Sequence, residues 1–270
     1  MTRSVLVTGA SSGIGLASAR LLAARGWRVF GTSRRGAAGA REPVPGIAWL
    51  RLDVRDEASV RACVGEAEAA SGADGLHALV CNAGFGIFGS VEEVSLEDAR
   101  AQFETNVFGV LACVRAVLPA MRARRRGRVV LVGSLAGRAP IPFQGHYSAS
   151  KAAVDSLAQA LRMEVAPFGI GVALVEPGDI RTAFNDATDF GDTSRSAYGE
   201  RIVRCEAVIR QSLEKAPGPE VVAEAVARAL DDDPPRTRYP VGPDSRAVPL
   251  GRRLLPEGLV HRLIRSHFGV

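Results

Sequence analysis

Seven short apolar runs alternate along the chain with longer segments in which apolar residues recur at helical spacing. β-Branched and aliphatic residues fill the short runs, which is typical of strands buried on both faces. The longer segments, such as 57–70 and 95–126, have the period of a helix that packs on one side. This alternation predicts an α/β fold: a doubly wound, mostly parallel, seven-stranded sheet with helices on both faces. The expected strands are residues 5–7, 28–33, 47–52, 78–81, 129–132, 171–175 and 239–241.

Two segments near the C-terminus depart from this alternation. Residues 183–217 are polar with scattered apolar positions, and so long an insertion after a sheet edge predicts a substrate-binding lid. Residues 245–270 are expected to form a C-terminal tail with one or two short helices. Because no repeat or low-complexity linker divides the chain, residues 1–270 are predicted to form a single domain.

The charge of the chain is concentrated in places. The formal net charge is +5, and arginines cluster at 122–128 and again at 252–265. Basic clusters can contact nucleic acid or membranes, but no nucleic-acid-binding motif accompanies them, so no nucleic-acid partner is expected. A solvated helix end explains the first cluster better.

The cysteines carry no metal or disulfide signature. The four cysteines are widely spaced without a C-x-x-C pair, so we expect neither a metal site nor a disulfide framework. The first strand begins by Val5, which leaves no room for a signal peptide. No apolar run reaches the roughly 20 residues of a membrane span. The prediction is a cytoplasmic protein without a membrane span.

A glycine-rich turn follows the first predicted strand. Its glycines have the spacing G-x-x-x-G-x-G: Gly9 allows the tight turn, Gly13 lets the backbone approach a diphosphate, and Gly15 lets the helix pack close to the strand. Such turns also join βα units that bind nothing, but the placement between strand and helix favours a dinucleotide site of the Rossmann type. The expected cofactor-binding residues of this turn are Thr8, Gly9, Ser11, Ser12, Gly13, Ile14 and Gly15.

The end of the second predicted strand indicates which dinucleotide is preferred. NAD sites place an acidic residue roughly 20 positions after the glycines, whereas this chain has Ser33 and Arg34 there. A guanidinium can clamp a 2′-phosphate, and one charged hydrogen bond corresponds to a preference for NADP(H) of about 10- to 150-fold. Two arginines in a loop could also be solvated charge; we favour the phosphate interpretation.

Further polar and small residues follow the other predicted strands. Carboxyl ends of parallel strands meet at the ligand-binding edge of an open α/β sheet. Asn106, by contrast, lies inside a predicted helix, where asparagine is disfavoured unless its amide is hydrogen-bonded, so it is an interface or a functional residue. The residues expected at the cofactor from this edge are Asp53, Val54, Asn82, Ala83, Gly84, Pro177, Gly178, Ile180 and Thr182.

Tyr147 and Lys151 are the predicted centre of the chemistry. They stand four residues apart at the start of a helical pattern, so their side chains share one face. A phenol titrates near ~10, and an ammonium ~4 Å away would favour the phenolate by ~4 kcal/mol, which lowers the pKa to ~7. A general acid or base works best near that value. Taken alone, the pair could equally be an ordinary amphipathic helix face.

Together these motifs resemble the short-chain dehydrogenase/reductase family, over nearly the whole chain. The resemblance rests on the glycine turn, Asp53, Asn82-Ala83-Gly84, Ser134, Tyr147-x-x-x-Lys151 and Pro177-Gly178. Cys81 stands where many members have a second asparagine. The family's catalytic residues match Asn106, Ser134, Tyr147 and Lys151.

The resemblance implies a role for each of these residues. Tyr147 would be the general acid or base, and Lys151 would lower its pKa and hold the nicotinamide ribose. Ser134 would hydrogen-bond the substrate oxygen, and the backbone near Asn106 would hold a water that links Lys151 to solvent. Thr182 and the Pro177-Gly178 turn would position the nicotinamide, Asp53 and Val54 would flank the adenine, and Ser12 would lie near the phosphates.

The resulting hypothesis is an NADP(H)-dependent oxidoreductase that acts on a hydrophobic ketone or secondary alcohol: a steroid, retinoid, polyketide or acyl-like carbonyl. The tail resembles the hydroxysteroid and retinol dehydrogenase branch. The alternatives are a non-catalytic NADP(H)-binding regulatory protein and an epimerase or dehydratase on the same fold. Apolar helix faces predict a homodimer or homotetramer. The expected substrate-binding residues are Ser134, Ile141, Phe143, Tyr147 and Phe184.

Overall fold

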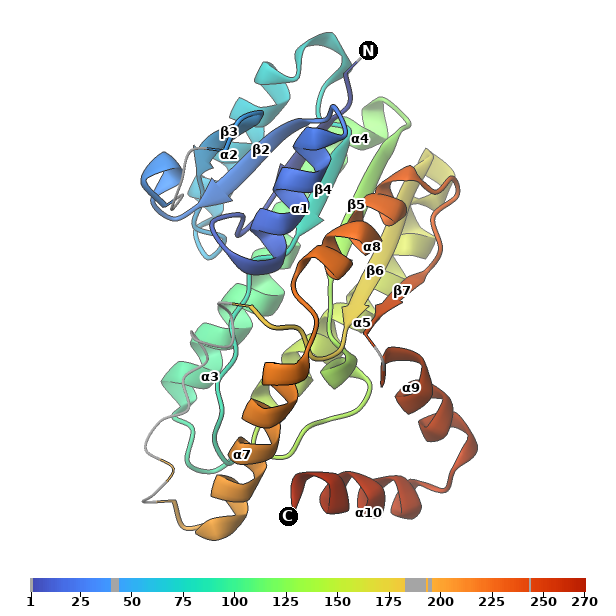
Figure 1. The fold of residues 1–270 in the computed structure, drawn as a ribbon. Helices are drawn as coiled ribbons and strands as arrows, with labels where there is room; N and C mark the ends of the chain where they lie inside the picture. The colour runs from blue at the N-terminus through green and yellow to red at the C-terminus, as the bar shows by residue number, and fades with distance from the viewer. Residues whose placement is uncertain (1, 40–43, 183–192, 194–195, 243) are drawn as a thin grey trace.

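A seven-stranded parallel sheet forms the centre of the protein. The computed structural model describes residues 2–39, 44–182, 193, 196–242 and 244–270. The strand order is β3-β2-β1-β4-β5-β6-β7, and every neighbouring pair is parallel. This arrangement confirms the doubly wound fold (Figure 1). The strands are β1 (Ser4–Val7), β2 (Arg28–Ser33), β3 (Ile47–Arg51), β4 (Ala78–Cys81), β5 (Gly127–Val132), β6 (Ile170–Pro177) and β7 (Arg238–Val241).

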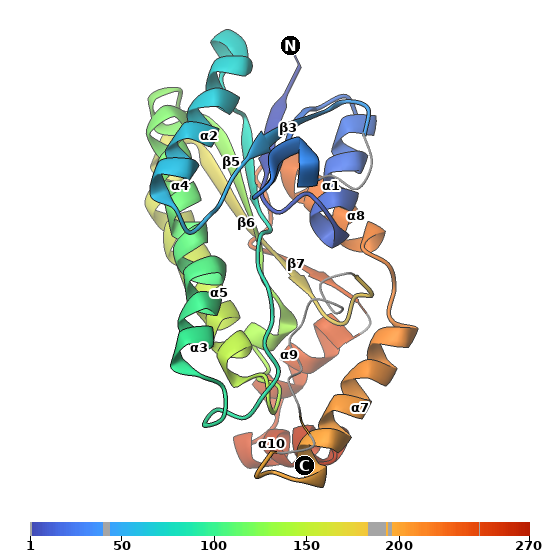
Figure 2. The ribbon, with the colours of Figure 1, turned by 90° about the vertical axis from the view of Figure 1, so that its left-hand side faces the viewer.

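Helices cover both faces of this sheet. In Figure 2, α2, α4 and α5 lie on one side of the strands, and α1 and α8 lie on the other. A π-helical turn at Glu104–Phe108 joins α3 to α4. The helices are α1 (Gly13–Ala24), α2 (Glu57–Ala70), α3 (Leu96–Phe103), α4 (Gly109–Ala123), α5 (Gly145–Val165), α7 (Glu200–Lys215), α8 (Glu220–Asp231), α9 (Asp244–Leu254) and α10 (Glu257–Phe268).

Each strand contributes side chains to two separate cores. Successive residues of a strand point to opposite faces, so Leu6 packs towards α2, α4 and α5, while Val5 and Val7 pack towards α1 and α8. Leu131 and Val130 of β5 divide in the same way. Both faces are therefore buried, which explains why the strands read as continuous apolar runs.

Polar residues set the helix starts that the sequence predicts. The Ser95 hydroxyl accepts a hydrogen bond from the Asp98 amide at the start of α3, and Asp56 caps α2 through the Ala58 amide. Such caps satisfy amides that have no partner within the helix. The helical run Leu96–Ala123 is long and apolar enough to cross a membrane by length and composition alone. Its residues Val114 and Val117 belong to the core against the sheet, so we interpret the run as a core helix.

Three arginines of the first cluster make contacts with other segments of the protein. Arg124 forms an ion pair with Glu68 at 3.0 Å, and Arg126 forms one with Asp74 at 2.8 Å. The Arg125 guanidinium donates to the Pro167 carbonyl. These contacts join α4 and the loop after it to neighbouring elements, so the cluster stabilises the fold.

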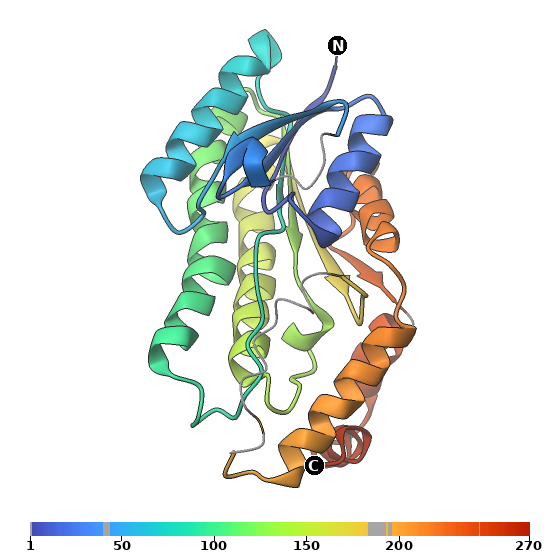
Figure 3. The same ribbon diagram turned by 60° about the vertical axis from the view of Figure 1, so that its left-hand side comes forward.

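Helix α7 lies within residues 183–217, the segment in which the sequence shows only scattered apolar positions. Its inward positions Ile202 and Cys205 are buried, whereas the apolar Val203 is exposed. The apolar residues therefore do not all mark the inward side, which obscures the helical period in the sequence. Figure 3 shows α7 in orange, running away from the sheet towards the C-terminus. The predicted tail helices are present as α9 and α10. The lid prediction for 183–217 and the single-domain prediction stay predictions, and Phe184 lies outside the described residues.

Candidate functional site

The glycine turn after β1 is closed by hydrogen bonds from the turn after β4. The Thr8 hydroxyl accepts from the amides of Asn82 and Ala83 at 2.9 and 3.0 Å. In return, Asn82 Nδ2 donates to the carbonyls of Thr8 and Gly9 at 3.0 and 3.2 Å. The side chain of Thr8 thus holds the turn after β4, and the side chain of Asn82 holds the turn after β1.

Gly15 is required by this close packing. A methyl group at Gly15 would lie 2.3 Å from the Gly9 carbonyl oxygen and 2.5 Å from Asn82 Nδ2. Gly9 itself has a φ of +65°, a conformation that L side chains rarely adopt. Two of the glycines are therefore needed by the turn itself, apart from any ligand.

The start of α1 has the chemistry of an anion site. Helix α1 begins at Gly13, and the hydroxyl of its N-cap residue Ser12 makes no capping hydrogen bond. No acidic residue lies in the first turn. Free amides at a helix N-terminus bear partial positive charge and bind phosphate groups. Ser11, Ser12, Gly13 and Ile14 therefore fit the diphosphate of a dinucleotide.

At the end of β2, two arginines follow a serine that is used locally. The Ser33 hydroxyl donates to the Gly36 carbonyl at 2.8 Å and accepts from the Arg35 amide at 3.2 Å. The Arg34 side chain is exposed. The Ser33 side chain thus fixes the turn, and Arg34 is the group free to meet a ligand.

Asp53, after β3, faces cations. It accepts two hydrogen bonds from the Arg55 guanidinium, at 3.0 and 3.2 Å. The bond from Arg55 lowers the pKa of the Asp53 carboxyl, and the nearby charge of Arg34 lowers it further. Val54 packs against Gly109 of α4. The predicted adenosine residues are therefore neighbours in space.

The segment after β6 returns to the glycine turn. The Gly178 amide donates to the Val241 carbonyl at 2.9 Å, which fixes the Pro177-Gly178 turn beside β7. Ile180 is buried. A methyl group at Gly13 would lie 3.4 Å from Thr182 Cβ. Thr182 thus lies against the start of α1, where a residue that orients the cofactor is expected.

Tyr147 and Lys151 occupy one side of the first turns of α5, as predicted. Lys151 is buried, with 7% of its surface exposed. Its Nζ donates to the Val132 carbonyl at 3.0 Å and lies 5.8 Å from the centre of the Tyr147 ring. The Tyr147 phenol is hydrogen-bonded to Ser134. The structure thus brings Ser134, Tyr147 and Lys151 together at the carboxyl end of β5.

Asn106 holds the loop after β4 against α5. Its Oδ1 accepts from the Phe85 amide, and its Nδ2 donates to the Phe85 carbonyl and to Ser150 Oγ, each at 3.0 Å. The amide is thus fully bonded, which explains an asparagine inside this helix. It lies in the π-helical turn, a feature often found at functional sites. A methyl group at Gly84 would lie 2.9 Å from Asn106 Oδ1 and 3.8 Å from Lys151 Nζ.

The pKa predicted for Tyr147 is wrong for the protein alone. Burial raises the pKa of the phenol; the bond with Ser134 offsets this in part, and the Asp179 carboxylate adds to it. Burial also lowers the pKa of Lys151 to about 8. The spacing of the two residues correctly predicts their shared face. It does not reveal that Nζ donates to the Val132 carbonyl, nor that the charge of Asp179 acts on the phenol.

Composition contains a signal for Lys151 that residue spacing does not. All basic residues of the chain are arginine except Lys151 and Lys215. Arginine stays charged when buried, whereas lysine changes its pKa readily. The one buried lysine of this arginine-rich chain thus stands where a titratable cation is useful.

The predicted substrate residues differ in their surroundings. The Ile141 amide donates to Ser148 Oγ at 3.2 Å, which ties the loop to α5. The Phe143 ring lies 6.0 Å from Phe88 and 5.5 Å from Tyr198. Phe143 therefore packs against protein on at least two sides, and contact with a substrate stays a prediction for it.

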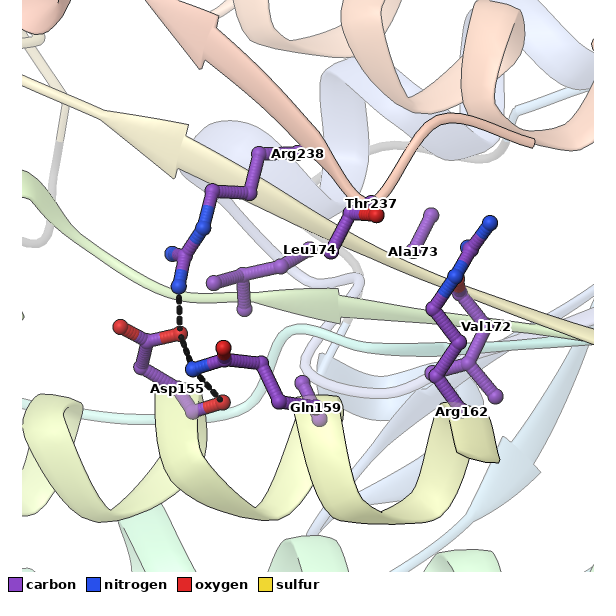
Figure 4. Close-up of a pocket in the computed structure, with 9 residues that line it drawn as sticks. Asp155, Gln159, Arg162, Val172, Ala173, Leu174, Thr237 and Arg238 are labelled. Atoms are coloured by element: carbon purple, nitrogen blue, oxygen red, sulfur yellow. Dashed lines mark hydrogen bonds and ion pairs between the residues drawn. The ribbon is translucent and has the colours of Figure 1, made fainter. Parts of the chain in front are cut away.

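A network of ion pairs connects α5 to β6 and β7. Asp155 continues the side of α5 that carries Tyr147 and Lys151, at intervals of four residues. Arg238 of β7 forms ion pairs with Asp155 at 2.6 Å and with Glu176 of β6 at 2.7 Å. Figure 4 shows Arg238 pointing from its strand onto the helix. The Glu176 side chain is only 4% exposed, so this network ties α5 to the edge of the sheet. Sequence analysis missed it.

In the portion of the chain that is described, no three His, Cys, Asp or Glu side chains gather in a way that could hold a metal ion. The arrangement offers a proton donor, a cation and a helix start suited to an anion at one sheet edge.

Known proteins resemble the chain over nearly its whole length. A family model described as short chain dehydrogenase matches residues 3–191. The 3-ketodihydrosphingosine reductase of Bacteroides thetaiotaomicron is 34% identical over 269 residues, which cover 98% of each chain. The estradiol 17-beta-dehydrogenase 1 of Rattus norvegicus is 36% identical, over 92% of this chain and 75% of its own.

Solved structures show the same fold. A short-chain dehydrogenase from Streptomyces avermitilis has a TM-score of 0.84 and 34% identity, over 97% of this chain and 95% of its own. Two relatives, both 26% identical over 97% of this chain, were solved with different cofactors. The Burkholderia cenocepacia protein, covered over 97% of its length, has a TM-score of 0.76 and contains NADP. The Burkholderia phymatum protein, covered over 95%, has a TM-score of 0.78 and contains NAD.

We expect Lys151→Met to stabilise the protein at neutral pH. The Lys151 pKa falls from 10.5 in the unfolded chain to about 8 when folded, so the buried charge costs stability below pH 8. After allowance for the Val132 carbonyl left without its donor, the free energy of unfolding at pH 7 should rise by about 1–2 kcal/mol. Urea unfolding measures this.

The gain should shrink as the pH rises from 8 towards 10.5, because the wild-type lysine then loses its proton in both states. Lys215→Met, at an exposed position, is the matched control and should change little. A Lys151→Met protein less stable than wild type at pH 7 would contradict the assignment.

Arg238→Met should lower the free energy of unfolding by about 3 kcal/mol, because buried Glu176 loses its closer cation and keeps only the 3.8 Å pair with Arg138. Arg236→Met removes a pair with Asp232 in which the arginine is exposed and should cost less than ~1 kcal/mol. Burial raises the pKa of Glu176, so the difference should narrow in acid, where that carboxyl becomes neutral. Equal losses in the two variants at neutral pH would refute the network's role.

Proposed function

The chain belongs to the short-chain dehydrogenase/reductase family, and from that premise we propose that it transfers hydride between NADP(H) and a hydrophobic ketone or secondary alcohol. The observation that carries the proposal is the assembly of Ser134, Tyr147 and Lys151 beside the turn that starts α1. A proton donor and a dinucleotide site at one sheet edge are what carbonyl reduction requires.

The cofactor would lie along the carboxyl ends of the strands. The amides of Ser12, Gly13 and Ile14 would bind the diphosphate, and Asp53 and Val54 would flank the adenine. Thr182 and the Pro177-Gly178 turn would orient the nicotinamide, which supplies the hydride when it is bound. Lys151 would turn its ammonium from the Val132 carbonyl towards the ribose hydroxyls.

Tyr147 would donate the proton to the substrate oxygen. The phenol keeps its proton at neutral pH, so it can act as the general acid in carbonyl reduction. Ser134 is hydrogen-bonded to that phenol and would bind the same oxygen as charge develops on it. Asn106 holds Gly84 and Ser150 beside Lys151, so it would keep a proton path from the lysine in place.

The preference for the phosphorylated dinucleotide is assigned to Arg34. Its guanidinium is exposed beside Asp53, whose carboxylate is already bonded to Arg55. A 2′-phosphate would find an available cation there and no unpaired carboxylate to repel it. Because one relative was solved with NADP and another with NAD, membership of the family does not indicate the cofactor, and the proposed preference rests on Arg34.

Two observations support the proposal that the substrate is apolar. Phe88, Phe143 and Tyr198 form an aromatic cluster with α7 on the side of the site away from the sheet. The names of the relatives refer to a sphingoid base and a steroid. We propose that the substrate is a lipid-like carbonyl compound that lies between this cluster and Tyr147.

Tyr147→Phe should lower the rate of NADPH oxidation with a ketone substrate by about 100- to 10,000-fold, because it removes the proton donor. NADPH binding, measured by fluorescence titration, should stay within about twofold of wild type. A panel of steroid, retinoid and long-chain ketones would identify the substrate first.

Tyr239→Phe is the control for the loss of a tyrosine hydroxyl, because the Tyr239 hydroxyl is bonded to Asp232 and to the Arg236 amide at the start of β7 and has no assigned part in the reaction. A Tyr147→Phe protein that keeps its turnover would exclude the proposed acid. So would a wild-type protein that binds NADPH yet reduces no ketone in the panel, which would favour a regulatory role.

Arg34→Ala should weaken NADPH binding by about 10- to 150-fold and NADH binding by little, because only NADPH has the 2′-phosphate. The dissociation constants of both cofactors measure this. Arg61→Ala, at an exposed site on α2, controls for the loss of one positive charge. An equal loss for the two cofactors would assign the phosphate to another group.

A further inference from the structure

The last two helices expose an unusual number of leucines. Helices α9 and α10 and the turn between them end the chain, beyond the carboxyl end of β7 (Figures 1 and 2). Exposed large apolar side chains normally occur singly. Here they recur within one short segment: Leu250 (58%), Leu254 (70%), Leu255 (37%), Leu259 (39%) and Leu263 (53%).

The leucines follow the helix period. Leu250 and Leu254 lie one turn apart on α9, and Leu259 and Leu263 lie one turn apart on α10. Val260, by contrast, is buried, and Phe268 at the end of α10 packs towards Ile202 of α7. The apolar sector of α10 is therefore wider than the part that the protein covers.

Arginines accompany these leucines. Residues 244–270 contain five arginines and two carboxylates, and Arg253 and Arg262 are exposed. The arginines near residue 125 form ion pairs with carboxylates of the fold. Within the described residues of the tail, the one ion pair joins His261 to Glu257. Arg253 and Arg262 thus remain available to an external anion.

We propose that α9 and α10 bind the surface of an anionic lipid bilayer. Helices with leucines on one side and arginines beside them lie in the interface between acyl chains and headgroups. Anionic headgroups attract each nearby arginine. The two helices have 11 and 12 residues, well short of the ~20 that a spanning helix needs, so they would lie along the surface.

Charge argues against a second copy of the chain on this face. A symmetric dimer places the same patch of both subunits together, so the arginines of one tail would meet those of the other. An anionic bilayer complements both the leucines and the arginines. Because α10 packs on α7 beside Phe88 and Phe143, docking would turn that side of the protein towards the lipid.

Sedimentation of the full-length protein with vesicles tests the proposal. Vesicles of phosphatidylcholine that contain about 30 mol% of the anionic lipid phosphatidylglycerol are compared with vesicles of pure phosphatidylcholine. Binding is expected to the anionic vesicles, to weaken as salt rises, and to be at least ~10-fold weaker on neutral vesicles.

Two variants separate the contributions. Leu254→Gln/Leu263→Gln should weaken vesicle binding by at least ~10-fold, because each leucine loses its apolar burial. Arg253→Glu/Arg262→Glu should do so by a similar factor. The matched controls are Leu96→Gln, which is as exposed as Leu254 (70%), and Arg61→Glu/Arg236→Glu, at exposed arginines elsewhere. Unchanged thermal unfolding of all variants shows that folding is retained.

Failure of the wild-type protein to bind anionic vesicles would overturn the proposal. So would a Leu254→Gln/Leu263→Gln protein that binds these vesicles as tightly as the wild type. A third result would also overturn it: self-association in lipid-free buffer, measured by light scattering, that Leu254→Gln/Leu263→Gln abolishes. That result would assign the leucines to a second copy of the chain. None of these measurements depends on the proposed reaction.

Discussion

The burial of one ammonium group is the constraint around which the site is built. Lys151 donates to the Val132 carbonyl inside the protein, at a position where a charge is unfavourable unless it is compensated. The elements around Lys151 hold the groups that surround its ammonium in fixed positions. β5 supplies the carbonyl, the π-helical turn places Asn106 beside the Gly84 backbone, and Gly137 lets the short helix after Ser134 close against the α5 backbone. The cation is thereby kept at the sheet edge, and the fold bears the energetic cost of keeping it there.

Sequence periodicity predicted the parts of the structure that depend on local pattern. The limits of β2, β4 and α2 agree with the predicted ones, because both faces of the strands and one face of the helix are buried. The fully bonded amide of Asn106 also agrees with its prediction, since a polar group inside a helix must find partners. Known chemistry of residue types was sufficient for these features.

Features that depend on contacts between distant segments could not be read in this way. Helix α7 mixes apolar with charged positions, and its inward side is defined by residues distant in sequence, among them Phe88, Phe143 and Phe268. The direction of Lys151 Nζ depends on a carbonyl 19 residues away, so the spacing to Tyr147 gave the shared face and the wrong pKa. The Arg238 network joins three elements, and none of its members carries a motif.

The scarcity of lysine also has a practical consequence. Lys215, at the end of α7, is exposed, whereas Lys151, the other lysine of the sequence, is buried. Amine-selective reagents should therefore modify one lysine side chain of the folded protein, without engineered cysteines. A fluorophore attached there would lie on the helix that flanks the aromatic cluster. Its emission would then follow displacements of α7 relative to the sheet while a ligand enters or leaves.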